Sequence, residues 1–158
     1  MASPATASPS TPLGLLGGTF DPVHKAHLAL ARSAMDELGL AGVRWIPSGT
    51  PGHRARPGTS VEDRLAMLKL ALAGEPRFSL DSFDALSPAA TYTINTLTRL
   101  RGELGTLRPL VFIIGADQLV ALDSWKDWRQ LFELAHFAVA ERPGYPLEHS
   151  RLPAALAE

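Results

Sequence analysis

The chain has 158 residues, enough for one domain with a sizeable core and too few for two. Hydrophobic residues make up 46% and charged residues 20%, as in soluble globular proteins. Lys and Arg number 15 against 16 Asp and Glu, a net charge of -1 that argues against a nucleic-acid polymer as partner, and the lack of cysteine excludes disulfides and thiolate metal sites.

The first twelve residues, "MASPATASPSTP", carry no charged side chain and little that a core would bury. They lack the basic start and apolar run of a secretory signal. We expect a disordered tail over 1–12 and a folded domain over 13–158. No stretch of about eighteen consecutive apolar residues occurs, so we expect no membrane-spanning helix and a cytoplasmic protein.

Apolar runs and helical periodicity alternate along the rest of the chain. The predicted strands are, in chain order, 13–18, 43–47, 77–83, 110–115 and 136–144. The predicted helices are 26–38 ending at Gly39, 60–73 capped by Ser60, 91–104, 116–135 as one or two helices, and a broken helical end over 147–158. This alternation predicts an α/β fold, a doubly wound Rossmann-like parallel sheet of about five strands with helices on both faces.

The stretch "LLGGTFDPVHKAH" follows the first predicted strand directly. Its glycines permit close approach of a ligand to the backbone, and a helix start favours an anion. Asp21 and Pro22 are predicted to be the cap and the first residue of that helix. His24 and His27 then fall three residues apart, close enough to face one ligand, although helix surface and a zinc pair remain open alternatives.

Several motifs in the same order resemble the bacterial nicotinate-nucleotide adenylyltransferase family, within the nucleotidylyltransferase superfamily. The similar stretches are "GGTFDPVHKAH", "SGTPGHR", "SVEDRLAMLKLAL", "TYTINTL", "FIIGADQLVALDSWKDWRQL" and "HFAVAERPGY". Together they cover about 13–145. The resemblance implies that the phosphate of nicotinate mononucleotide attacks the α-phosphorus of ATP, which gives deamido-NAD and pyrophosphate. The two imidazoles would then be donors to phosphate oxygens.

The resemblance also implies the role of each site residue. His24 and His27 would be catalytic and contact the phosphates of ATP. The other residues implied for ATP are Gly18, Thr19, Phe20, Gly115 and Asp117. The residues implied for the mononucleotide are His53, Arg54, Thr91, Tyr92, Thr93, Trp125 and Arg142.

Several of these residues could instead have a purely structural role. Asp117 could be a helix cap, the threonines an ordinary helix start, and Arg142 a solvated side chain. Trp125 could be core, and for Trp128 we prefer the core. Magnesium is expected to arrive with ATP, since no dedicated carboxylate cluster is visible. The sequence does not predict the oligomeric state.

The chain departs from the family pattern at three places. Ala26 stands where the family has Gly between the histidines. Gly52 and Arg54 replace the second Pro and the Lys of the P-P-H-K loop. The family's I-S-S-T-x-I-R motif, expected to close over the ATP phosphates, is missing before Glu158.

The alternatives in function are an adenylyltransferase for nicotinamide mononucleotide, phosphopantetheine or another small phosphate ester, a non-catalytic nucleotide-binding module, and a metal-dependent hydrolase. For the hydrolase, the five histidines form no ligand constellation in the sequence.

Overall fold

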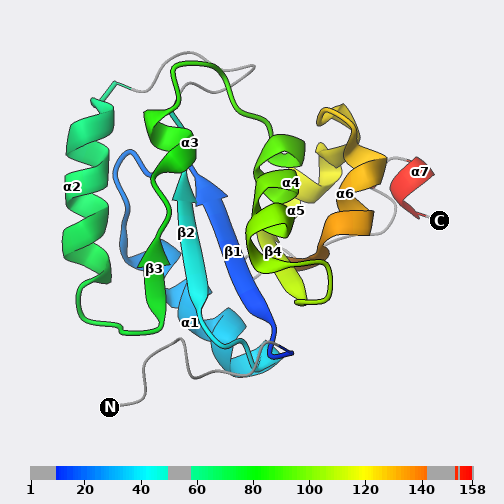
Figure 1. The fold of residues 1–158 in the computed structure, drawn as a ribbon, viewed down its shortest axis with the longest axis horizontal. Helices are drawn as coiled ribbons and strands as arrows, with labels where there is room; N and C mark the ends of the chain where they lie inside the picture. The colour runs from blue at the N-terminus through cyan, green and yellow to red at the C-terminus, as the bar shows by residue number, and fades with distance from the viewer. Residues whose placement is uncertain (1–9, 50–57, 142–151, 153, 158) are drawn as a thin grey trace.

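The computed structural model describes residues 10–49, 58–141, 152 and 154–157. Its sheet has five strands, all parallel, in the order β3-β2-β1-β4-β5 (Figure 1). The strands are β1 (Leu13–Gly18), β2 (Val43–Pro47), β3 (Phe78–Leu80), β4 (Leu110–Gly115) and β5 (His136–Ala140). The predicted doubly wound α/β sheet is confirmed.

Helices cover both faces of this sheet, with α1 behind it and α4 in front in Figure 1. They are α1 (Lys25–Leu38), α2 (Val61–Leu72), α3 (Phe83–Leu86), α4 (Thr93–Leu104), α5 (Ala116–Val120), the 3-10 helix η2 (Leu122–Ser124), α6 (Trp128–Leu134) and α7 (Ala154–Ala157). Neighbouring residues of β1 enter different cores: Leu16 packs with α1 and α2, and Leu15 packs with α4 and α6. This alternation is what a strand buried on both faces requires.

Local signals in the sequence account for several boundaries. Gly39 ends α1 in the left-handed conformation, with φ 62°. Ser60 caps α2, since its Oγ accepts the Asp63 amide at 3.1 Å. β4 is a continuous apolar run that is buried over 110–114. These three predictions are confirmed, and the predicted bounds 13–18, 43–47 and 110–115 match β1, β2 and β4.

Other predicted boundaries are wrong. The strand predicted over 77–83 ends at Leu80, because Asp81 Oδ1 accepts the Phe83 amide at 3.1 Å and α3 begins there. The helix predicted from 91 begins at Thr93. The stretch 116–135, predicted as one or two helices, forms the two α-helices α5 and α6 with the 3-10 helix η2 between them. The last strand stops at Ala140. The tail over 1–9 and most of the predicted helical end lie outside the described residues.

The fold places the predicted site at one edge of the sheet. β1 lies at the centre, with β2 on one side and β4 on the other, so the strand order reverses beside it. In open α/β sheets, ligands bind beyond the carboxyl ends of the strands at such a reversal. Figure 1 shows the arrowheads of β1 and β2 pointing to the end where α2 begins. In the described part of the chain, no helix is both long enough and apolar enough to cross a membrane.

Candidate active site

The turn after β1 packs its aromatic side chain back under the end of the strand. Phe20 is 4% exposed and has a φ of 50°, in the left-handed region that few non-glycine residues adopt. A Cβ atom on Gly18 would lie 3.3 Å from the Phe20 ring, a tight contact that the ring would have to yield to. Glycine therefore leaves room for this ring. A ligand at this turn would meet the backbone of 18–20 and not the Phe20 side chain.

The two histidines lie side by side at the N-terminus of α1. His24 is the N-cap residue, and its amide donates to Nδ1 of His27 at 3.0 Å. The imidazole rings are stacked, with centroids 3.8 Å apart and planes 25° apart. The His27 ring also meets Phe20 edge-on at 5.0 Å. The predicted proximity of the two imidazoles is therefore confirmed.

The hydrogen bond within this pair decides which nitrogen of His27 carries the proton. A nitrogen that accepts a hydrogen bond is unprotonated, so in neutral His27 the proton is on Nε2. Partial burial lowers the pKa of His27, and the nearby His24 charge lowers it further. His27 is thus a neutral imidazole with one N–H donor, and that donor is the nitrogen left free by the helix cap.

We expect this state to be visible in the ring nitrogens of His27 by 15N NMR. Nδ1 should resonate as the unprotonated nitrogen, with a titration midpoint below the ordinary value of about 6.5. Between the lowered pKa of His27 in the folded protein and its ordinary pKa in the unfolded chain, the unfolded chain binds more protons. The contribution of His27 to the free energy of unfolding should therefore fall as the pH drops below about 6.5. A midpoint above that value, or a proton on Nδ1 of the neutral ring, would contradict this assignment.

The prediction that Asp21 caps the helix and Pro22 begins it is wrong. The helix begins at Lys25, because His27 caps the His24 amide. The Asp21 carboxylate instead accepts the amide of Thr59 at 3.4 Å, and the Asp21–Pro22 peptide bond is cis. Hydrogen bonds from Thr59 lower the pKa of Asp21, with a smaller contribution from a nearby arginine of α2. Asp21 thus joins the turn after β1 to the start of α2.

Gly115 and Asp117 follow the strand next to β1. Gly115 ends β4 and is the N-cap residue of α5, where its amide donates to Gln118 Oε1 at 2.9 Å. Asp117 is exposed in the first turn of α5 and is not its N-cap residue. An acidic side chain in the first turn complements the helix dipole, which explains Asp117 without a ligand. Both residues lie at the same sheet edge as Gly18.

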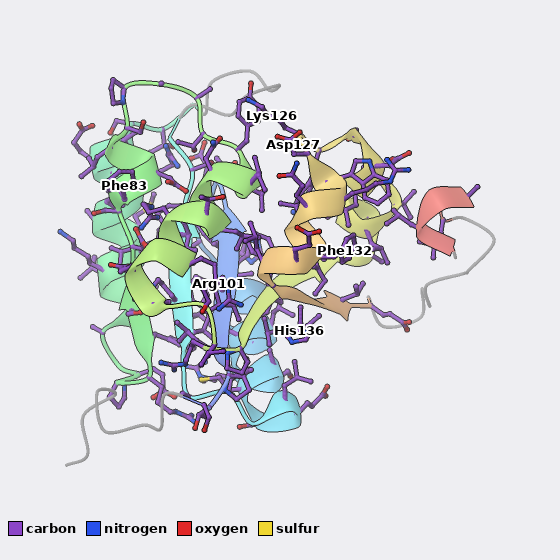
Figure 2. All side chains as sticks on the ribbon, turned by 45° about the vertical axis from the view of Figure 1, so that its right-hand side comes forward. Phe83, Arg101, Lys126, Asp127, Phe132 and His136 are labelled. Atoms are coloured by element: carbon purple, nitrogen blue, oxygen red, sulfur yellow. The ribbon has the colours of Figure 1, made fainter. Side chains whose placement is uncertain are left out.

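The "TYT" segment forms the start of α4. Tyr92 is the N-cap residue and makes no side-chain cap hydrogen bond, and Thr93 is the first residue of the helix, as the alternative of an ordinary helix start supposed. The Lys126 ammonium lies 4.9 Å from the centroid of the Tyr92 ring. Figure 2 shows Lys126 at the end of the molecule where α4 begins. The loop between η2 and α6 therefore reaches this segment.

Both tryptophans of "SWKDW" pack, partly buried, against the core cluster on the α4 side of the sheet. Trp128 packs on this cluster and also meets Phe132, which is 48% exposed, edge-on at 6.3 Å, so it lies at the margin of the core. Trp125 meets Phe112 of β4 at 6.4 Å, and Phe112 lies 3.4 Å from where a Cβ on Gly17 would be. Trp125 thus packs on Phe112 of β4, the strand next to β1.

Three predicted site residues, His53, Arg54 and Arg142, lie outside the described residues. Gly52 lies outside them as well. Ala26, which replaces the family's Gly, is exposed in the first turn of α1.

Sequence reasoning missed Arg64, which contacts the turn after β1 from α2. Its guanidinium donates to the carbonyl oxygen of Thr19 at 2.8 Å, although the two residues are 45 positions apart. A signal was present: Arg64 precedes Leu68 by four residues and Leu72 by eight, so it lies on the buried face of α2. A charged residue on an otherwise apolar stripe indicates a specific buried partner.

Within residues 10–49, 58–141 and the described C-terminal positions, no group of three or more His, Asp or Glu could hold a metal ion. His24 and His27 have no third candidate ligand there, so that part of the chain offers no support for a zinc pair or a metal-dependent hydrolase.

Comparison with known proteins shows which family this chain belongs to. The sequence pattern of the cytidylyltransferase-like family matches residues 15–155. A Dechloromonas aromatica protein named "Probable nicotinate-nucleotide adenylyltransferase" is 53% identical over 148 residues, which cover 94% of this chain and 68% of that protein. A Laribacter hongkongensis protein of the same name is 50% identical over 152 residues, 96% of this chain and 68% of its own. The chain belongs to the nicotinate-nucleotide adenylyltransferase family.

Solved structures agree with this assignment at the level of the fold. The nicotinic acid mononucleotide adenylyltransferase of Plasmodium falciparum, in complex with NaAD, superposes with a TM-score of 0.75 over 90% of this chain and 72% of its own. The sequence identity is 19%, so this likeness concerns the fold alone. The Rossmann-like architecture of this family member is thereby confirmed.

Proposed function

We propose that this nicotinate-nucleotide adenylyltransferase family member transfers the adenylyl group of ATP to nicotinate mononucleotide in NAD biosynthesis. The products are deamido-NAD and pyrophosphate. One observation carries the proposal: two stacked imidazoles lie at a helix N-terminus directly after the central strand. The names of relatives that are half identical to this chain support the choice of acceptor.

The reaction needs no deprotonating side chain. An oxygen of the mononucleotide phosphate, already anionic, forms a bond to the α-phosphorus of ATP. The bond from that phosphorus to its bridging oxygen breaks, and the electron pair leaves with pyrophosphate. The protein must align the two phosphates and offset the negative charge on the transferred and departing groups.

The residues after β1 would bind the triphosphate of ATP. Nε2–H of His27 is a directed donor, because its other nitrogen is engaged in the helix cap. His24 is exposed and stacked on it, so both rings would reach the same phosphates. The backbone of Gly18, Thr19 and Phe20 would line the pocket. Gly115 and Asp117, at the end of β4, would lie beside the adenosine.

The residues around the start of α4 would bind the mononucleotide. Thr91, Tyr92 and Thr93 would offer backbone and hydroxyl donors to the nicotinate carboxylate and the phosphoribose. Trp125 would stack on the pyridine ring, and its contact with Phe112 of β4, the strand next to β1, supports this role. We assign His53, Arg54 and Arg142, outside the described residues, to the same substrate by their position in the family motifs.

Replacing Trp125 with alanine should raise KM for nicotinate mononucleotide by about tenfold or more, since stacking on an aromatic ring contributes about 1–3 kcal/mol per base. KM for ATP should change little. Trp128→Ala is the matched control, because both rings pack on the same core cluster. If both variants raise the mononucleotide KM equally, Trp125 has no specific contact with that substrate.

Magnesium would enter with ATP. No group of three or more candidate ligand residues occurs in the described part of the chain. Magnesium commonly binds polyphosphate oxygens, retains several waters and needs few protein ligands. Its contribution would be to neutralise charge on the polyphosphate, while the imidazoles of His24 and His27 act on the phosphate oxygens directly.

The proposal is tested by incubating the protein with ATP, magnesium and one acceptor at a time. The acceptors are nicotinate mononucleotide, nicotinamide mononucleotide and phosphopantetheine, with the Dechloromonas aromatica relative as a parallel sample. We expect pyrophosphate and deamido-NAD in equal amounts, with the nicotinate compound preferred. Faster reaction with another acceptor would change the substrate, and ATP binding with no pyrophosphate from any acceptor would make the chain a nucleotide-binding module.

A further inference from the structure

Arg64 is the buried charge nearest to the proposed ATP site. It is 1% exposed and lies on α2, on the face that otherwise presents leucines to the core. One nitrogen, Nη1, donates both to the Thr19 carbonyl at 2.8 Å and to the Ser48 carbonyl at 2.7 Å. These two carbonyls belong to the first residues after β1 and β2. A single guanidinium group therefore joins the two loops that leave neighbouring strands.

The burial of Arg64 is costly in itself. Taking a guanidinium out of water has a large desolvation cost, which only well-placed hydrogen bonds offset. Among the described residues, the buried Nε of Arg64 has no hydrogen-bond partner, so the group is not fully satisfied. A leucine would continue the apolar face of α2 but would leave both carbonyl oxygens without this donor. The geometry of the two carbonyls is what a leucine would not supply.

The bond to Thr19 sets the direction of a backbone donor. In a trans peptide, the carbonyl and the following N–H point in opposite directions. Because the Thr19 carbonyl points to Arg64, the Phe20 amide N–H points away from it. Phe20 itself has φ 50° and a buried ring, which fixes the other side of the same turn. Asp21 adds a third link, through its contact with Thr59 just before α2.

We propose that Arg64 is a positioning residue for adenylyl transfer. It acts through the Thr19 peptide and holds the turn after β1 in the orientation that presents the Phe20 amide to the ATP phosphates. It also keeps that turn at a fixed distance from the loop after β2. This inference rests on the proposed function. It assigns to a residue of α2 the role of positioning the turn after β1 without contact with the phosphates.

The test compares Arg64→Lys and Arg64→Met with Lys69→Met, an exposed position on the same helix. Binding of a non-hydrolysable ATP analogue is measured by calorimetry, kcat and KM by pyrophosphate release, and folding by circular dichroism. We expect Arg64→Met to weaken analogue binding and to lower kcat/KM for ATP by about 100-fold, the scale of a misplacement near 1 Å. KM for the mononucleotide should change far less.

Arg64→Lys keeps the charge and one donor group, so it should fold and recover part of the loss. If Arg64→Met fails to fold, Arg64→Lys is the variant on which the same measurements are made. In 15N-labelled protein, both variants should shift the Phe20 amide resonance, and Lys69→Met should not. A folded Arg64→Lys with analogue affinity, kcat and the Phe20 resonance close to those of the parent would overturn the inference. Lack of dinucleotide formation by the parent itself would instead refute the proposed function.

Discussion

Replacing His27 with alanine is expected to lower kcat by about 10²- to 10³-fold. Removing one donor from a site that stabilises developing charge costs about 3–4 kcal/mol in the transition state. His27 is suited to this role because its Nδ1 accepts the His24 amide, which leaves Nε2–H free as the donor. We expect a comparable loss for His24→Ala, whose ring is stacked on that of His27.

His27 also has a structural role, because it caps the His24 amide, and the effect of losing this cap must be separated from the effect on catalysis. Alanine at this position removes the cap of the His24 amide, which should lower the free energy of unfolding by about 1 kcal/mol. The assay is therefore made well below the melting temperature of each variant. His136→Ala, an exposed histidine at the start of β5, is the matched control and should keep the parent rate.

His27→Gln tests whether the His27 side chain acts as a hydrogen-bond donor or only fills space by packing. Glutamine places an amide N–H near the position of Nε2, so this variant should recover part of the rate lost by alanine. Rates of His24→Ala and His27→Ala within a few-fold of the parent would show that the imidazoles do not act on the phosphates.

The second large effect is expected at Gly49, in the loop that follows β2. A Cβ atom there would lie 2.7 Å from the carbonyl oxygen of Ala85 and 2.9 Å from that of Asp84. Both contacts are with the backbone of α3, so no side-chain rotation can relieve them. Gly49→Ala should lower the free energy of unfolding by about 3 kcal/mol, the upper part of the range for overpacking.

Thermal unfolding measures this effect directly. For a chain of this size, about 3 kcal/mol corresponds to a fall in Tm of about 6–12 °C. Gly74→Ala is the control, because a Cβ at Gly74 would meet no atom within 4 Å. Equal Tm values for Gly49→Ala and the parent would mean that the loop after β2 does not pack on α3 as described.

The strands could be predicted where an apolar run is bounded by glycine or proline. β1 ends at Gly18, β2 at Pro47 and β4 at Gly115, and all three match the prediction. β3 is shorter than predicted, because Leu80 is followed by the polar residues Asp81 and Ser82, and Asp81 Oδ1 accepts the amide of Phe83. This local side-chain hydrogen bond starts a turn where the prediction had continued the strand to Phe83.

The candidate site could be predicted only in part. The spacing of His24 and His27 indicated that the two side chains lie close together. Histidine is not among the residues that usually cap a helix, so the prediction assigned the N-cap to Asp21 and not to His24. The leucine spacing of α2 indicated that Arg64 is buried, but its partners, Thr19 and Ser48, come from other parts of the chain and meet it only in the fold. Contacts of this kind follow from topology and not from local pattern.

The structure of this protein with a non-hydrolysable ATP analogue tests the central claim most directly. We predict that Nε2 of His27 lies about 2.7–3.2 Å from a phosphate oxygen, with the His24 ring against the same polyphosphate and the Phe20 amide facing it. A nucleotide bound elsewhere, or bound at this turn with both imidazole rings away from its phosphates, would contradict the account.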